Sequence, residues 1–110
     1  MIMLPKNRAP THPGQMLLHE FLEPMELTQK QFSSHLNWTY AKLNEIINCK
    51  RGVTPKSAVD LSEALGMGAE FWLNLQNNYD LWLEKQKRNK LKSRKEIKRL
   101  KPLKKIVNYG

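Results

Sequence analysis

One stretch of the sequence, residues 27–51, restricts the possible folds more than any other. It begins with Thr28 and, three residues later, Gln31, which is the S/T-x-x-E/Q pattern of a capping box at a helix N-terminus. Phe32 and Leu36 follow four residues apart, so they share one face of that helix. The stretch therefore opens with a short helix that has one apolar face.

A second short helix follows after a tight turn. Asn37 is the kind of residue that tolerates a left-handed turn conformation, and Thr39 is suited to cap the next helix. The apolar residues of this second helix, Leu43, Ile46 and Ile47, have the three- and four-residue spacing of one buried face. Two short helices joined in this way form a helix-turn-helix, in which the second helix enters the major groove of DNA.

The residues around the second helix fit a DNA-facing surface. Gln29 opens the first helix, and Lys50 and Arg51 come directly after the second, where a phosphate contact is needed. The side of the second helix away from its apolar residues is polar and carries Tyr40, Lys42, Asn44 and Glu45. An ordinary helical corner with a solvated polar face is the alternative interpretation.

Composition and charge placement agree with a DNA-binding protein. The 110 residues, with 40% hydrophobic and 26% charged residues, are typical of one folded domain with a tail. Residues 85–105 hold twelve Lys or Arg and one acid (+11), whereas the rest of the chain holds seven against nine (−2). The seven basic residues include Lys30, Lys42, Lys50, Arg51 and Lys56, which cluster around the predicted recognition helix. This asymmetry predicts one DNA-facing side.

Several other functional classes are not expected. One cysteine excludes a disulfide framework and suits a reducing cytoplasm, where we expect the protein. No apolar run approaches the roughly 20 residues of a membrane span, so no membrane partner is expected. The histidines lack metal-ligand spacing and no catalytic constellation is evident, so we expect neither a metal, nor a cofactor, nor an enzyme.

The whole pattern predicts an all-α fold of five helices with a basic tail. We expect a flexible arm over residues 1–10, the helix-turn-helix domain over 11–84 and a basic extension over 85–110. The first helix is capped by Thr11 or His12 and ended by Pro24. The fourth runs from Thr54 and Pro55 to Gly66, and the fifth from Gly68–Ala69 to Gln86. Ser93, Glu96 and Pro102 predict a further short helix, Arg94 to Lys101.

The fifth helix is apolar on more than one side. Trp72, Leu75, Tyr79 and Trp82 form one stripe, and Phe71, Leu81 and Leu83 lie off it. A helix with two apolar faces needs two partners. We therefore predict a homodimer whose interface includes Phe71, Leu81 and Leu83, with a large aromatic core as the alternative.

Beyond the motif, the chain resembles phage-repressor-type (Xre-like) proteins and, within them, the HigA family of type II antitoxins, also called addiction module antidote proteins. The similarity lies in HPGQMLLHEFLEPMELTQKQFSSHL, LNEIINCKRGVTPKSAVDLSEALG and FWLNLQNNYDLW, and covers residues 11 to about 103. It implies a dimer that neutralises a HigB toxin, a RelE-like ribosome-dependent ribonuclease, and represses its own operon. A stand-alone Xre-type regulator without a toxin is the alternative. An RNA-binding protein acting through the basic tail is a more remote alternative, since the tail lacks the aromatic stacking platform of single-strand recognition.

The resemblance also implies roles for individual residues. Gln29 and Thr39 would touch phosphate, Arg51 would hold the DNA backbone, and the bases would be faced by Tyr40, Lys42 and Asn44. The family usually has arginine or serine in place of Tyr40 and glycine in place of Cys49. Because a cysteine at positive φ costs about 1 kcal/mol, we expect the recognition helix to end differently here. The basic tail either reaches flanking phosphates or is a solvated lysine-rich helix.

Overall fold

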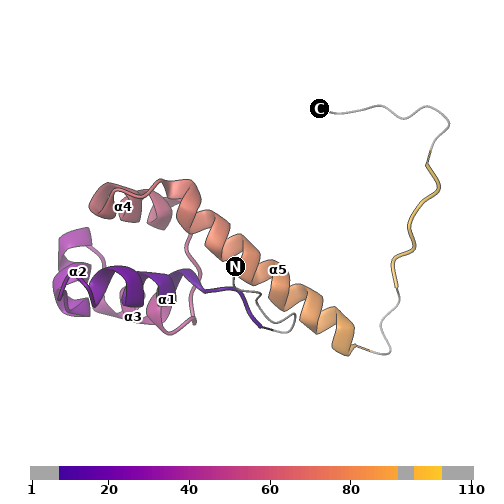
Figure 1. Ribbon diagram of the computed structural model, residues 1–110, viewed down its shortest axis with the longest axis horizontal. Helices are drawn as coiled ribbons and strands as arrows, with labels where there is room; N and C mark the ends of the chain where they lie inside the picture. The colour runs from indigo at the N-terminus through magenta and orange to yellow at the C-terminus, as the bar shows by residue number, and fades with distance from the viewer. Residues whose placement is uncertain (1–7, 92–95, 103–110) are drawn as a thin grey trace, which may run out of the picture.

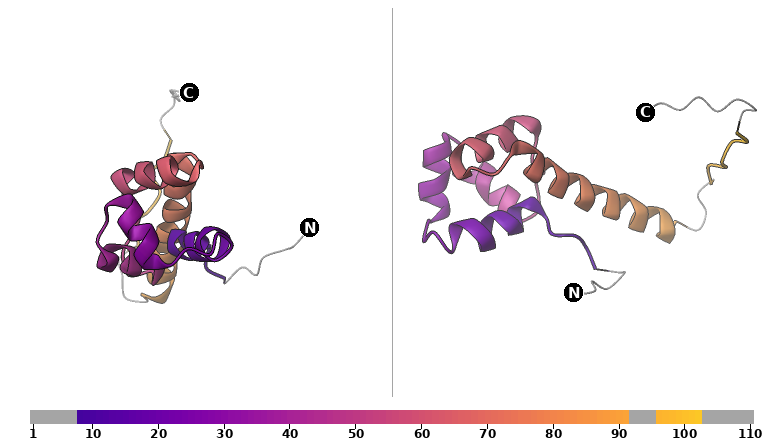
Figure 2. Two further views of the ribbon diagram at one scale, coloured as in Figure 1. Left: turned by 90° about the vertical axis from the view of Figure 1, so that its left-hand side faces the viewer. Right: turned by 45° about the horizontal axis from the view of Figure 1, so that its top comes forward.

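The structure, a computed structural model, describes residues 8–91 and 96–102, and its helices follow the predicted order. They are α1 (Pro13–Leu17), the π-helical turn η1 (Leu18–Leu22) that continues it, α2 (Gln29–Leu36), α3 (Tyr40–Ile47), α4 (Pro55–Leu65) and α5 (Ala69–Lys90). Helices α1–α4 gather at one end of the molecule, and α5 runs from them into solvent (Figure 1). The right-hand view of Figure 2 shows the same projection. The described residues contain no strand, so the expected all-α fold is confirmed.

The helix boundaries around the turn are set by the predicted caps. The Thr28 hydroxyl accepts from the Gln31 N–H at 3.1 Å, and the Thr28 N–H donates to the Gln31 side chain at 2.9 Å. Asn37 takes the left-handed conformation, with φ of 59°. The Thr39 hydroxyl then accepts from the Lys42 N–H at 3.1 Å and starts α3. Local sequence alone thus determines where α2 ends and where α3 begins.

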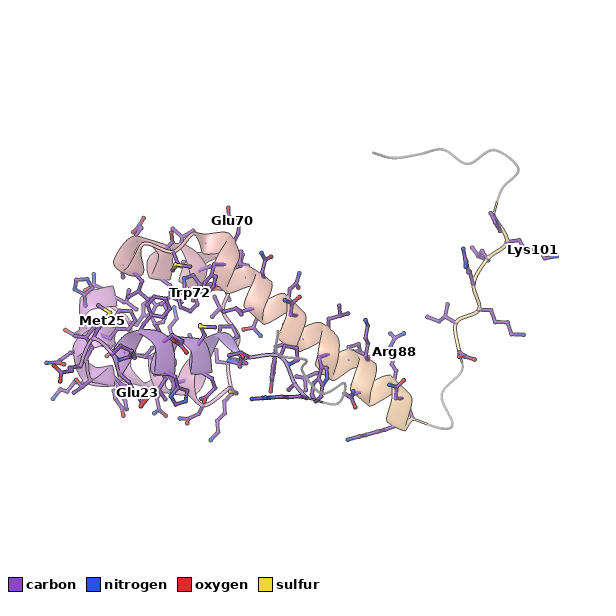
Figure 3. The ribbon with its side chains drawn as sticks, viewed as in Figure 1. Glu23, Met25, Glu70, Trp72, Arg88 and Lys101 are labelled. Carbon is purple, nitrogen blue, oxygen red and sulfur yellow. The ribbon has the colours of Figure 1, made fainter. Side chains whose placement is uncertain are left out.

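The core is built from one face of each helix. Its fully buried large residues are Leu17, Leu22, Leu43, Ile46, Leu61 and Trp72. Trp72 is the one buried residue of α5, and its ring lies 5.4 Å from that of Phe21 and 5.0 Å from that of Phe71. In Figure 3 Trp72 points between α5 and the helices below it, whereas Arg88 points into solvent. Trp72 therefore anchors the beginning of α5, and the core holds α3 in place.

α1 and α3 cross with almost no space between their backbones. A Cβ added at Gly14 would lie 1.8 Å from the Ile46 carbonyl oxygen, so this crossing requires glycine. The Gln15 side chain donates to the carbonyl of Ile47 at 2.7 Å, and α1 thereby binds the C-terminal end of α3. The position of the recognition helix is fixed from behind by backbone contact rather than by side-chain packing alone.

Two expectations about the C-terminal part need correction. The first is the end of α5, which lies at Lys90 rather than Gln86. Residues 96–102 have no helix, so the predicted helix Arg94 to Lys101 is wrong over them, and residues 94 and 95 lie outside the described residues. An isolated helix shorter than about 12–15 residues is marginal in water. Here Lys98, Arg99 and Lys101 also repel one another, and Ile97 and Leu100 are exposed instead of packed.

The expected change at the end of α3 does not occur. Cys49 takes the left-handed conformation itself, with φ of 62°. Its N–H donates to the Ile46 carbonyl at 3.1 Å, and the Lys50 N–H donates to the Glu45 carbonyl at 2.8 Å. These bonds satisfy carbonyls at the end of the helix and offset the roughly 1 kcal/mol that a side chain costs at positive φ.

None of the helices described here is long and apolar enough to cross a membrane.

Candidate DNA interface

The helix-turn-helix brings Gln29 and Asn44 together across the α2–α3 junction. The Asn44 side chain donates to the Gln29 side chain at 3.1 Å, although the two residues lie fifteen positions apart. Asn48 donates to the carbonyl of Asn44 at 2.9 Å and to its side-chain oxygen at 3.1 Å. Asn44 is consequently held between α2 and the next turn of α3, in one orientation.

Glu45 and Arg51 form an ion pair on the outer side of the motif. The Arg51 Nε donates to the Glu45 carboxylate at 2.8 Å, and Nη2 of the same guanidinium lies 2.7 Å from the same oxygen. Both side chains remain about half exposed. Glu45 can thus orient the guanidinium while other N–H groups of Arg51 point outward. Lys50, the neighbour of Arg51, is exposed.

Lys42 lies apart from the other predicted base-facing residues. Its ammonium lies 4.2 Å from the ring centroid of Trp38, whose indole N–H donates to Asp60 at 2.9 Å. Lys56 contacts the same Asp60 oxygen at 3.3 Å. Tyr40 and Lys42 are about 200° apart around α3, so they do not share one face. The structure therefore places Lys42 on the flank beside α4 and not with Tyr40 and Asn44.

Burial, a hydrogen bond and neighbouring charges alter two pKa values on this flank. Partial burial lowers the pKa of Lys42, and the nearby Lys56 and Arg51 lower it further, while Asp60 opposes them. The hydrogen bond from Trp38 and the contact with Lys56 together lower the pKa of Asp60. Several cations thus lie close together on this side of the molecule, as contact with a polyanion requires.

Two residues of the outer face were missed in the sequence. Ala41 is exposed and lies opposite the buried side of α3, between Tyr40 and Glu45, and Asn48 follows on the next turn. A helical projection of residues 40–48 would have placed both at the centre of the face. An alanine at such a position leaves room for close approach by a ligand, and alanine is a residue type that contacts thymine methyl groups in protein–DNA complexes. Tyr40, 54% exposed at the start of α3, is beside it, and Thr39 is exposed at the cap.

The three residues expected at a dimer interface lie in different environments. Phe71 is half-buried and packs edge-on against Trp72 of its own chain. Leu81 and Leu83 are exposed, at 54% and 44%. They are about 200° apart around α5, so one flat interface takes only one of them. Leu83 continues the side of Tyr79, four residues earlier, whereas Leu81 lies among Asn77, Asn78, Asp80 and Glu84.

Comparison with known proteins shows to which protein family the chain belongs. No family model matches the chain. Antitoxin HigA-1 of Vibrio cholerae is 40% identical over 98 residues, which are 88% of this chain and 87% of the relative. This chain belongs to the HigA family of antitoxins.

Two solved antitoxin structures have the same fold. Antitoxin GraA superposes with a TM-score of 0.73 and 30% identity, covering 82% of this chain and 99% of GraA. Pseudomonas aeruginosa antitoxin HigA, solved with the higBA promoter, gives a TM-score of 0.67 and 27% identity, covering 77% of this chain and 96% of that one. Within the described residues of this HigA-family chain, no three His, Cys, Asp or Glu side chains are grouped to hold a metal ion.

Proposed function

We propose that this HigA-family chain is an antitoxin that represses its own operon through α3 and neutralises a HigB-like toxin, a RelE-like mRNA-cleaving ribonuclease. The observation that carries the DNA-binding part is the preorganised outer face of α2–α3. Asn44 is held by Gln29 and Asn48, and Arg51 is held by Glu45, before any DNA is bound. Groups fixed in advance lose less conformational entropy on binding.

The geometry supports a division of roles among these residues. Tyr40, Ala41 and Asn44 would face base edges, because Tyr40 and Ala41 are exposed at the N-terminal end of α3 and the half-buried Asn44 lies one turn beyond Tyr40 on the same side. Gln29, Thr39, Lys50 and Arg51 would contact the DNA backbone. Glu45 would orient Arg51, and Lys42 would meet phosphate from its seat on Trp38. Such a protein acts by binding alone, without an enzymatic step, and does so in the cytoplasm, where its operator would be.

A homodimer would present two recognition helices to a palindromic operator. Half-sites would then lie about 10 bp apart or a multiple of it, on one side of the duplex. The part of α5 that projects beyond the body carries the exposed Leu83, on the same side of the helix as the half-buried Tyr79, and is our candidate for the interface. The V. cholerae relative named antitoxin HigA-1 supports the toxin-binding part of the proposal.

Co-expression tests the antitoxin function. The reading frame next to this gene, cloned with a tag, should yield a protein that co-purifies with the chain and that stops cleaving mRNA when the chain is present. A control variant, Tyr40→Ala, should still bind that toxin because it alters only the proposed DNA face. If no protein encoded by an adjacent reading frame binds the chain, the antitoxin function is contradicted and the chain is a stand-alone regulator.

A further inference from the structure

The last turns of α5 belong neither to the hydrophobic core nor to the predicted DNA-facing surface around α3. After Trp82, every residue through Lys90 is exposed except the half-buried Gln86. Figure 1 shows this end of the helix projecting beyond the body, and Figure 3 shows Arg88 pointing into solvent. We define the basic end of α5 as Lys85, Lys87, Arg88 and Lys90.

We propose that the basic end of α5 is a second DNA contact, which binds the phosphates of duplex DNA without regard to sequence. Four cations lie within six residues, and the one ion pair found for them among the described residues joins Arg88 to Glu84 at 3.1 Å. Lys98, Arg99 and Lys101 are exposed further along the chain. The residues outside 85–105 have a slightly negative balance, so the net charge of +9 comes from this part of the chain.

Helix stability explains only part of this positive charge. Basic residues in the last turn do interact favourably with the helix dipole, and this accounts for Lys87, Arg88 and Lys90 individually. However, Lys85–Arg88 and Lys87–Lys90 are like-charge pairs three residues apart, which destabilise a helix. Lys98, Arg99 and Lys101 lie outside any helix and receive no such benefit. The repulsion among these groups is relieved when a polyanion binds.

The chemistry of the segment favours a DNA duplex among the possible polyanions. Residues 83–102 contain no Phe, Tyr or Trp, so bases of a single strand would find no stacking platform. The exposed leucines form no separate apolar face, because Leu83 and Lys87 are four residues apart on the same side. A helix lying on a membrane surface needs such a face. Duplex DNA needs only positive charge, since it carries one negative charge per roughly 1.7 Å.

Because the basic end of α5 belongs to the same chain as α3, its contact with DNA would raise the DNA affinity of the whole protein. If the recognition helix binds as proposed, the basic end of α5 meets neighbouring DNA at a high effective concentration. It would raise affinity for operator and other sequences alike, because phosphate contacts carry no sequence information.

Salt dependence on a random-sequence duplex tests the contact directly. The full chain is compared with a variant carrying Lys85→Gln, Lys87→Gln, Arg88→Gln and Lys90→Gln, and with a charge-conserving control carrying Lys85→Arg, Lys87→Arg, Arg88→Lys and Lys90→Arg. Each contacted phosphate contributes about 0.9 to the slope of log K against log salt. Cations two residues apart lie about 200° apart around the helix, so one duplex meets only some of the four. We therefore expect the glutamine variant to lose about 2 in slope and the control to keep it, with equal helicity by circular dichroism.

The same titration separates this proposal from the proposed function. An unchanged slope in the glutamine variant would overturn the proposal. So would charge-dependent binding to phosphatidylserine vesicles that exceeds binding to the duplex. If the slope falls as expected but the unmodified chain does not prefer its own promoter to random DNA, the basic contact stands and the operator function fails.

Discussion

At the scale of single residues, His12 links two parts of the fold. Its Nδ1 accepts from the Gly14 N–H at 2.9 Å and caps α1, and its ring lies edge-on to that of Tyr79 in α5 at 4.8 Å. Burial lowers the pKa of His12, and the nearby Asp80 opposes that shift. Protonation at Nδ1 would also remove the acceptor that the cap requires.

This environment predicts a pH-dependent stability. Because the pKa of His12 is lower in the folded state, the unfolded chain takes up its proton first as the pH falls below about 6.5. The stability contributed by neutral His12 is present above that pH and is lost as the pH falls toward the folded-state value. Urea unfolding at pH 7.5 and 5.5 measures how far the free energy of unfolding falls between the two pH values. This decrease should be smaller for His12→Asn than for the unmodified protein, because asparagine keeps a capping side chain but does not titrate. An equal loss in both proteins would exclude His12 as the cause.

Residue-level features were predictable from sequence to very different degrees. The caps Thr28 and Thr39 depend on local spacing, and the structure has both. The contact of the Lys42 ammonium with the Trp38 ring is not predictable in this way. The Trp38 ring is itself hydrogen-bonded to Asp60 of α4, more than twenty residues away, and no local pattern encodes such a contact. The exposed position of Ala41 follows from helical periodicity, but its methyl side chain carries no polar group that would indicate a binding residue.

At the scale of helices, the crossing of α1 and α3 gives the sharpest prediction. Gly14→Ala would place a Cβ 2.6 Å from the carbonyl carbon of Ile46 and 2.8 Å from the Cα of Ile47, so a backbone must move. We expect a loss of about 3 kcal/mol or more in the free energy of unfolding, at or above the usual upper range for overpacking.

Gly68→Ala provides the matched control. At Gly68 the added Cβ meets only the flexible carboxylate of Glu70, at 3.1 Å, and the effect should stay within about 1 kcal/mol. Denaturant titration of both variants measures the difference. A stable Gly14→Ala protein would mean that α1 can move away from α3 at little cost.

Helix starts and ends were mostly predictable, and the exceptions have physical reasons. Gly66 ends α4 at φ of 84°, as its sequence position indicates. The π-helical turn η1, which ends at the buried Leu22, has no local signature in the sequence. The capping-box pattern in the tail predicted a helix that 96–102 do not form, since a cap cannot replace a packing surface.

At the scale of the whole molecule, the part of α5 that projects beyond the body should determine the oligomeric state. Leu83→Ala should weaken dimerisation, because Leu83 extends the side that carries Tyr79, while Leu81→Ala on the opposite side should not. Analytical ultracentrifugation over a range of concentrations measures both dissociation constants, and circular dichroism confirms the fold. A weaker dimer in Leu81→Ala alone would assign the interface to the other side of α5.

The central claim is that α3 reads sequence while Arg51 holds the DNA backbone. The decisive measurement is the affinity of Tyr40→Ala and Arg51→Gln for the chain's own promoter and for a random duplex, over a range of salt concentrations. Tyr40→Ala should reduce the preference for the promoter by about 1–3 kcal/mol. Arg51→Gln should weaken both duplexes alike and reduce the salt slope by about one. If both variants lose affinity equally on the two duplexes, α3 is not the element that reads the sequence.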